Sequence, residues 1–249
     1  MSVDIVELRA FYASPLGSVA RRRVVEAMDR LWGPLHGQRV LGLGFTIPFL
    51  RPEGADRTLA LMPATQGVVA WPEGGRSSTC LADPLMLPLP DSCVDRILVV
   101  HALETSESPS ELLYEAWRVL TPGGRLLVVA PNRRGLWARL DVTPFGQGQP
   151  YSRSQLKRLL RRALFTPETW TETLYMPPLR SGVLIRTAEA WERLGTGLNL
   201  PFAGLHVVDA TKQLHRPLLV RQVRRAERFA PVLVPSHAPS RREAPPARA

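Results

Sequence analysis

The sequence has few residues of several kinds, and each scarcity excludes a class of protein. Its two cysteines, Cys80 and Cys93, show no metal-ligand spacing and form no disulfide framework. No apolar run approaches the roughly 18 residues that a membrane-spanning helix requires. The first residues contain acids and no apolar segment, so we expect no signal peptide, no membrane association and a cytoplasmic location.

Lysine is nearly absent, because Lys157 and Lys212 are the only two, and arginine supplies almost all of a net charge of +10. Seven arginines and two glutamates fall from Arg221 onward, so five of the ten net positive charges lie at the end of the chain. From about residue 224 the sequence is mainly Pro, Arg, Ala and Ser, which cannot bury enough apolar surface to fold. We therefore predict a folded domain over 1–223 and a disordered basic tail over 224–249.

The body of the chain alternates between short apolar runs and helical patterns. Helices are predicted to begin at the caps Ser14, Ser108 and Ser152, and a further one over 187–194 with Gly195 just after its end. Strands are predicted at 39–44, 58–62, 79–81, 97–100, 126–130 and 206–210. This alternation predicts parallel βαβ units and a sheet covered by helices on both faces.

Glycines follow the first predicted strand, at the edge of the sheet where ligands of open parallel sheets bind. Gly42 and Gly44 leave the backbone bare, which permits a ligand to approach closely or simply makes a tight turn. A dinucleotide-binding fingerprint is excluded, because Ile47 stands where its third glycine belongs.

A longer segment, DPLMLPLPDSCVDRI at 83–97, is more specific. Together with Gly44 upstream and LTPGGRL at 120–126 downstream, it resembles the class I S-adenosylmethionine-dependent methyltransferases of the broad "type 11" group. The resemblance covers about 39–131 and extends more loosely to a terminal strand at 204–212. It implies an α/β, Rossmann-like class I methyltransferase fold with a seven-stranded, mostly parallel sheet, helices on both faces and one reversed strand.

The same resemblance implies that S-adenosylmethionine lies over the ends of the first two strands. Gly42, Gly44 and Phe45 would then face the methionine part of the cofactor. Asp83 falls where the family has an acid that accepts a hydrogen bond from the adenine amine, and Leu85 would touch the adenine ring.

Two acids of the family pattern are absent. Gly42 stands where the first motif usually opens with an acid, and the second strand ends in LMPATQ without the acid that binds the ribose. Gln66 is our candidate for a neutral ribose contact, since an amide both donates and accepts hydrogen bonds. His101 and Glu104 border the expected methyl group and are candidates for a catalytic base, which is needed only if the acceptor must lose a proton.

These observations leave more than one function open. The leading hypothesis is a methyltransferase that uses S-adenosylmethionine and a small, unidentified acceptor. The two missing acids favour a second hypothesis, a catalytically silent methyltransferase-like subunit that binds or scaffolds a protein partner. The arginine clusters favour a third, an RNA-associated protein, although no nucleic-acid-binding motif accompanies them.

Overall fold

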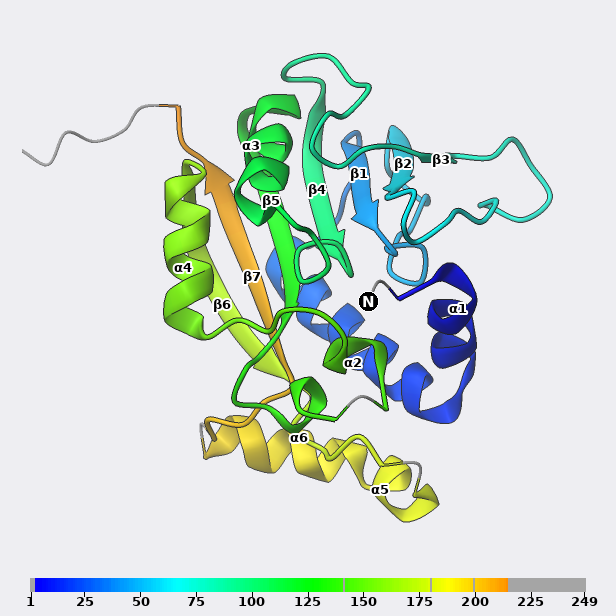
Figure 1. The fold of residues 1–249 in the computed structure, drawn as a ribbon, viewed down its shortest axis with the longest axis vertical. Helices are drawn as coiled ribbons and strands as arrows, with labels where there is room; N and C mark the ends of the chain where they lie inside the picture. The colour runs from blue at the N-terminus through cyan, green and yellow to red at the C-terminus, as the bar shows by residue number, and fades with distance from the viewer. Residues whose placement is uncertain (1–2, 141, 180, 199, 215–249) are drawn as a thin grey trace, which may run out of the picture. The chain divides into compact units, whose positions relative to one another are not determined.

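The computed structural model describes residues 3–140, 142–179, 181–198 and 200–214, so the predicted tail at 224–249 and its boundary lie outside the described residues. At its centre is one sheet in the strand order β3-β2-β1-β4-β5-β7-β6 (Figure 1). The strands are β1 (Arg39–Gly44), β2 (Arg57–Met62), β3 (Thr79–Leu81), β4 (Val94–Val100), β5 (Leu120–Pro131), β6 (Phe165–Thr173) and β7 (Leu205–Lys212). Of the strands in the described ranges, only β7 runs against its neighbours, which confirms the predicted seven-stranded, mostly parallel sheet.

Two helical layers cover the sheet. The helices are α1 (Ile5–Ala13), α2 (Pro15–Trp32), α3 (Pro109–Val119), α4 (Arg153–Arg162), α5 (Gly182–Arg186) and α6 (Ala188–Gly197). Because side chains alternate along a strand, Leu41 and Leu43 pack on the α3 and α4 side, whereas Val40 packs on the α2 side. None of the helices in the described ranges combines the length and apolar character needed to cross a membrane.

Most of the predicted elements are confirmed, and the exceptions have local causes. Strand β6 was not predicted, because Pro167 and its polar neighbours break the strand pattern; the pairing register with β7 shifts just after this proline. The predicted helix start at Ser108 is confirmed, but the expected side-chain cap is wrong, because the Ser108 side chain makes no capping bond. Gly195 lies inside α6, and not after its end. A glycine fits there because the ring of Tyr175 occupies the space that a β-carbon would take.

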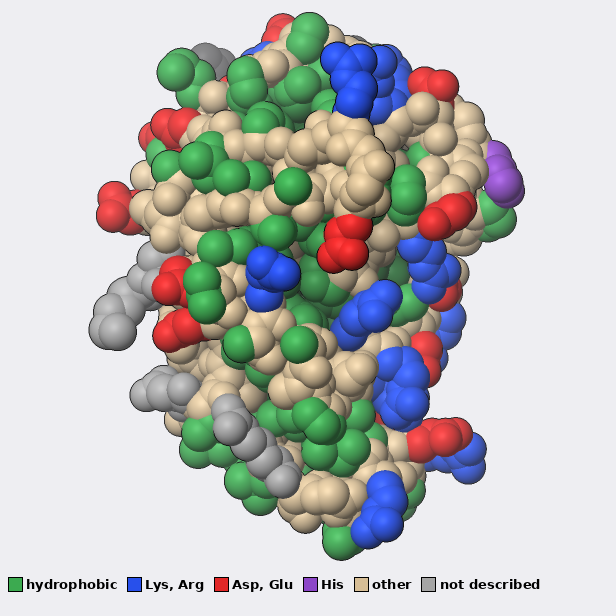
Figure 2. Space-filling view, turned by 90° about the vertical axis from the view of Figure 1, so that its right-hand side faces the viewer, with side chains coloured by type: hydrophobic (Ala, Val, Ile, Leu, Met, Phe, Trp, Pro, Cys, Tyr) green, Lys and Arg blue, Asp and Glu red, His purple; other side chains and the backbone are tan. Residues whose placement is uncertain are grey.

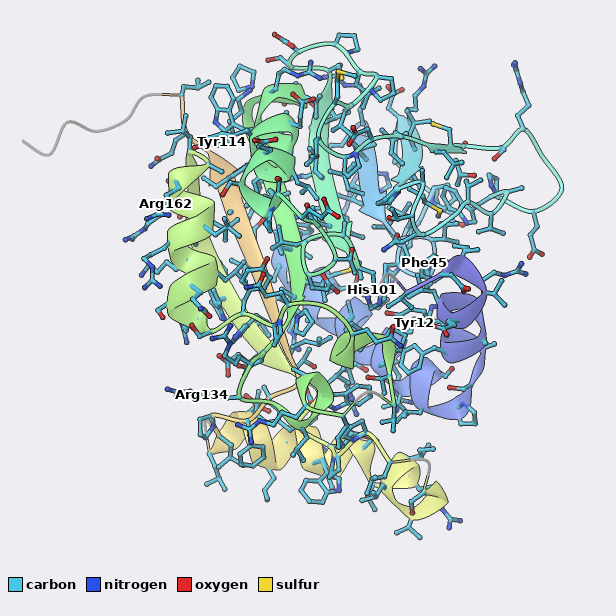
Figure 3. The ribbon with its side chains drawn as sticks, in the orientation of Figure 1. Tyr12, Phe45, His101, Tyr114, Arg134 and Arg162 are labelled. Atoms are coloured by element: carbon cyan, nitrogen blue, oxygen red, sulfur yellow. The ribbon has the colours of Figure 1, made fainter. Side chains whose placement is uncertain are left out.

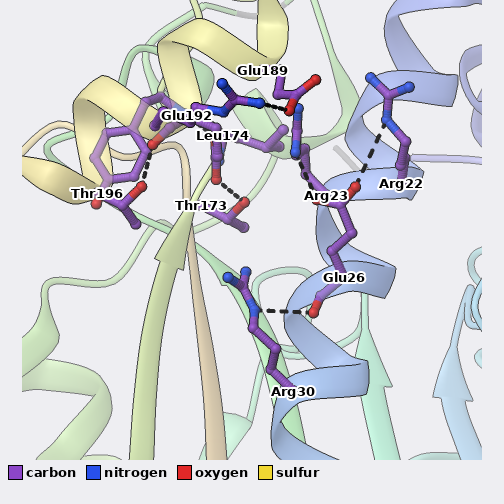
Figure 4. A network of polar contacts seen from close by, with 11 residues as sticks. Arg22, Arg23, Glu26, Arg30, Thr173, Leu174, Glu189, Glu192 and Thr196 are labelled. Atoms are coloured by element: carbon purple, nitrogen blue, oxygen red, sulfur yellow. Dashed lines mark hydrogen bonds and ion pairs between the residues drawn. The ribbon is translucent and has the colours of Figure 1, made fainter.

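One carboxylate fastens helix α6 to the end of β6. Glu192 accepts hydrogen bonds from the backbone amides of Leu174 and Tyr175, each at 3.2 Å, and from the hydroxyl of Thr173 (Figure 4). These amides have left the sheet, so the carboxylate supplies the acceptor that a backbone N–H needs when it is withdrawn from water.

A buried acid joins three elements near the other end of the sheet. Asp209 on β7 has a fully buried side chain, and its carboxylate forms an ion pair with Arg125 on β5. The indole Nε1 of Trp32, the last residue of α2, donates to the same carboxylate at 3.1 Å. The acid is therefore held by a charge and by a neutral donor from separate layers.

We expect Asp209→Asn to lower the free energy of unfolding by about 3 kcal/mol, because it leaves the Arg125 guanidinium without its buried partner. Asp95→Asn is the matched control. Asp95 also binds an arginine through two bonds of 3.0 Å, but the side chains of Arg39 and Asp95 are 41% and 28% exposed, so the loss should be about 0–1 kcal/mol. Urea denaturation of both variants measures the difference, and equal losses would contradict the assigned role of Asp209.

Candidate functional site

The two glycines of β1 are required by the packing of the chain itself. A β-carbon on Gly44 would lie 2.3 Å from the carbonyl oxygen of Val100, and the residue has a φ of +83°. A β-carbon on Gly42 would lie 2.0 Å from the hydroxyl oxygen of Thr46. The turn after β1 therefore folds back on the strand, and the space beside Gly42 is taken by the Thr46 side chain.

Helix α1 covers the carboxyl ends of β1 and β2. It begins at the cap Asp4, whose side chain accepts a hydrogen bond from the Glu7 amide at 2.8 Å. Its Leu8 is fully buried in a small apolar cluster with Phe45 and Met62, the residues at the ends of these two strands. The sequence pattern does not predict this helix, because nine residues with one buried side chain give little periodicity.

Tyr12, near the end of α1, is held in place by aromatic rings and one hydrogen bond. Its ring stacks on Phe45 at 5.7 Å and meets Phe49 edge-on at 5.4 Å. Its hydroxyl lies 2.7 Å from Nε2 of His101 (Figure 3). Burial, and secondarily the negative charge of Glu104, raises the pKa of Tyr12 well above 10.0. Tyr12 is therefore a neutral phenol at physiological pH.

His101 and Glu104 follow β4 as a buried pair. Nδ1 of His101 lies 3.2 Å from Oε1 of Glu104, and the two side chains are 0% and 1% exposed. This approach is not aligned as a hydrogen bond, so Nδ1 and both carboxylate oxygens lack a hydrogen-bond partner among the described residues. His101 also has a φ of 55°, in the left-handed region that side chains other than glycine rarely adopt. Strained backbone and an unsatisfied acid thus coincide at one place.

Gln66 joins this buried group. Its side-chain amide donates to the carbonyl oxygen of His101, and its own Oε1 has no hydrogen-bond partner among the described residues. Its backbone carbonyl accepts from the amide of Ile5 at 2.7 Å. The loop after β2 is therefore attached both to the start of α1 and to the end of β4.

Asp83 and Leu85 lie apart from this group, after the edge strand β3. Asp83 is exposed, and its Oδ1 accepts a hydrogen bond from the Leu85 amide at 2.9 Å. Leu85 is partly buried against the core cluster on the α3 side. Among the described residues, neither Asp83 nor Leu85 forms a hydrogen bond or ring contact with Tyr12 or His101. The structure thus gathers Phe45, Gln66, His101 and Glu104, with Asp83 and Leu85 further along the same edge.

The loop before α4 supplies two further site residues. The ring of Phe145 lies 4.6 Å from that of His101 and 6.0 Å from that of Phe11. Gly148 has a φ of +99°, and a β-carbon there would lie 2.6 Å from the carbonyl oxygen of Glu104. The sequence Phe-Gly-Gln-Gly at 145–148 indicates a flexible segment with one apolar side chain. It does not indicate which other loop this segment contacts in the fold.

The charged surface gives little support to a nucleic-acid or metal site. In the face that Figure 2 shows, basic side chains run along one edge and are interspersed with acidic ones. Arginines of α2 and of the loop after β1 are paired, as Arg22 is with Glu26 and Arg51 with Asp29. Within the described ranges, no group of three or more His, Cys, Asp or Glu side chains could hold a metal ion.

Comparison with known proteins gives a family match over part of the chain. Residues 42–128 match a family described as a methyltransferase domain. The ubiquinone/menaquinone biosynthesis C-methyltransferase of Acidiphilium cryptum (strain JF-5) is 43% identical over 53 residues, which is 21% of this chain and 21% of that protein. The chain therefore matches only about a fifth of the length of this curated relative.

Solved structures share the fold over most of the described chain. A methyltransferase of Thermotoga maritima, a possible histamine N-methyltransferase that depends on S-adenosylmethionine, has a TM-score of 0.58 and 19% identity, covering 84% of this chain and 96% of its own. The [4+2]-cyclase SpnF has a TM-score of 0.54 and 20% identity, covering 79% and 82%. Identities this low show the fold, and the second example is named for a reaction other than methyl transfer.

The strand order, the reversed β7 and the match at 42–128 agree with one another. Neither of the two acids that the family resemblance implies is present, since Gly42 stands at the first position and Pro63 follows β2. The described chain therefore has the fold of the class I S-adenosylmethionine-dependent methyltransferases, and its residues 42–128 match a methyltransferase-domain family.

Proposed function

We propose that this chain transfers the methyl group of S-adenosylmethionine to a small acceptor, and that helix α1 moves to admit both molecules. The observation that carries the proposal is the buried carboxylate of Glu104, which has no hydrogen-bond partner among the described residues. An unsatisfied buried group costs about 1–3 kcal/mol, and more when it is charged. Such violations of polar satisfaction are expected at functional sites.

The polar groups at this edge of the sheet suit S-adenosylmethionine. The exposed acid Asp83 would accept from the adenine amine, and Leu85 would border the adenine ring. The unpartnered Oε1 of Gln66 would accept from a ribose hydroxyl, and the backbone of 42–45 would face the methionine part. When bound, the cofactor supplies an electrophilic methyl group on a sulfonium ion.

The space between these groups is filled by the chain's own side chains. Phe45 is 3% exposed and Gln66 is 2% exposed, and Tyr12 lies against both Phe45 and His101. The cofactor therefore requires these side chains to separate, and α1 is the element that carries Tyr12. We infer that the described conformation is the closed form of the site.

Displacement of α1 would also free a base. A Tyr12 hydroxyl that donates to Nε2 leaves the ring proton of His101 on Nδ1, beside Glu104. When Tyr12 leaves, Nε2 can accept a proton from an acceptor hydroxyl or amine in its place. The Glu104 carboxylate, 3.2 Å from Nδ1, would stabilise the imidazolium that forms.

A surface cleft next to this site supports a small acceptor. The cleft has a volume of about 590 Å³, within the usual range for small-molecule sites, and it is bordered by Phe11, Thr143 and Gln147. Thr143 is buried, and its hydroxyl has no hydrogen-bond partner among the described residues. Phe11 and Phe145 separate the cleft from His101, so movement of α1 would connect the two.

The filled space favours a second candidate function, the silent subunit. If α1 never leaves, Phe45 and Tyr12 replace the cofactor as part of the core. The chain would then keep the methyltransferase fold as a scaffold for a protein partner. The two candidates differ in whether the full-length protein binds the cofactor or its product.

We expect S-adenosylhomocysteine to bind the full-length protein, and Asp83→Ala to weaken binding by about 1.5–3 kcal/mol through loss of a charged hydrogen bond to adenine. Glu107→Ala is the control, since Glu107 is another exposed acid in the loop after β4. Calorimetric titration measures both. Equal affinity of Asp83→Ala and the wild type would remove Asp83 from the site, and no binding to the wild type at millimolar ligand would favour the silent subunit.

We expect Tyr12→Ala to raise the association rate of S-adenosylhomocysteine by about tenfold, because it removes one hydrogen bond and the ring packing that hold α1 closed. Val6→Ala changes a residue of the same helix that is 70% exposed, and it should leave the rate unchanged. Stopped-flow fluorescence measures these rates. An unchanged or slower rate in Tyr12→Ala would show that α1 does not control entry.

A further inference from the structure

A second cleft lies near the other end of the sheet's carboxyl edge, around the start of helix α4. It has a volume of about 340 Å³, and its border includes Asn132, Arg134, Arg153, Glu172 and His206. Asn132 directly follows β5, and His206 is the second residue of β7. Figure 3 shows Arg134 far from Tyr12 and Phe45, beyond the lower end of β7. This cleft is therefore separate from the proposed methyl-transfer site.

The histidine of this cleft has a donor without an acceptor. The indole Nε1 of Trp170 lies 3.2 Å from Nδ1 of His206. Because an indole N–H only donates, Nδ1 must accept, and the ring proton of His206 then lies on Nε2. This Nε2 is buried and has no hydrogen-bond partner among the described residues, and the side chain is only 2% exposed. A buried N–H that borders a cleft without a partner indicates a missing acceptor.

Helix α4 presents further donors to the same cleft. Its capping box at Ser152 satisfies the amides of Ser152 and Gln155. The amides of Arg153 and Ser154, the first two helical residues, precede any intrahelical acceptor. Backbone N–H groups at the start of a helix, together with the helix dipole, favour a negatively charged ligand.

Two arginines give the cleft a positive balance. The guanidinium of Arg153 lies 5.1 Å from the Trp170 ring, which positions it beside the His206 donor. Arg134 is the second, and its backbone amide donates to the side chain of Asn132 at 3.0 Å. Glu172 opposes them with one negative charge, 3.4 Å from Nδ1 of His206.

We propose that this cleft binds an oxyanion, the phosphate group of a small molecule or phosphate itself, through Arg134, Arg153, Nε2 of His206 and the first amides of α4. A tetrahedral oxyanion offers several acceptor oxygens at once, which matches guanidinium and N–H donors that converge from separate elements. The donors outnumber the single acid Glu172. The site does not depend on the proposed methyl transfer, because none of its residues belongs to the group around His101.

Calorimetric titration of the full-length protein with inorganic phosphate and with phenyl phosphate tests the proposal. We expect Arg134→Ala and Arg153→Ala each to weaken binding by about tenfold or more, as for the loss of a charged hydrogen bond. Arg158→Ala is the control, because it removes the same charge from an exposed position on α4 outside the cleft. It should change affinity less than about twofold. Tighter binding of phenyl phosphate would identify a phosphate ester as the ligand, and equal binding would identify phosphate.

The nitrogen resonance of the His206 side chain tests the proposal in the wild-type protein, without any variant. In the wild type, saturating phosphate should shift the side-chain nitrogen resonance of Nε2 of His206 and leave that of His101 unchanged. Absence of binding at about 10 mM of either ligand would overturn the proposal. If Arg158→Ala and Arg134→Ala weaken phosphate binding equally, or if the His206 resonance does not shift on binding, the proposal is also overturned. Phosphate would then bind to positive surface charge in general and not to this cleft.

Discussion

The hydrogen bond between the Tyr12 hydroxyl and His101 is the interaction that holds helix α1 over the proposed methyl-transfer site. It connects α1 to the end of β4 across 89 residues of sequence, at a distance of 2.7 Å. Without it, the ring of Tyr12 would still pack on Phe45, but the polar end of that ring would be buried without a partner. Because both atoms are withdrawn from water, each needs the other, and α1 is held over the carboxyl ends of β1 and β2.

The closed site is apolar and tightly packed around groups that packing does not explain. Phe45, Leu8 and Met62 form a small core that needs no ligand. Beside it, the buried carboxylate of Glu104 has no hydrogen-bond partner in the part of the chain that the structure describes, and His101 has a backbone conformation that is unfavourable for a side chain. A core built for stability alone would replace both with apolar residues. Their combination beside the proposed cofactor position links the strain to the movement that we propose for α1.

The two clefts illustrate how one edge of a parallel sheet can hold separate sites. Strand ends, helix starts and loops all meet at the carboxyl edge, so polar groups concentrate there by topology. The β1 to β4 part of the edge is covered by α1, whereas the β5 to β7 part remains open beside α4. Asp209, toward the opposite end of β7, is by contrast fully paired with Arg125 and Trp32, as expected of a buried charge with a structural role.

The sequence by itself determined the type and order of most elements, because they rest on local properties. The apolar run at 97–100, the cap at Ser152 and the segment at 83–97 each report burial, turn chemistry or family over a few neighbouring residues. Only the tertiary structure decided that Tyr12 closes on His101, that Gln66 bonds inward, and that Arg153, Trp170 and His206 converge. Those contacts join residues far apart in the chain, and a contact between distant residues leaves no periodic pattern in either segment.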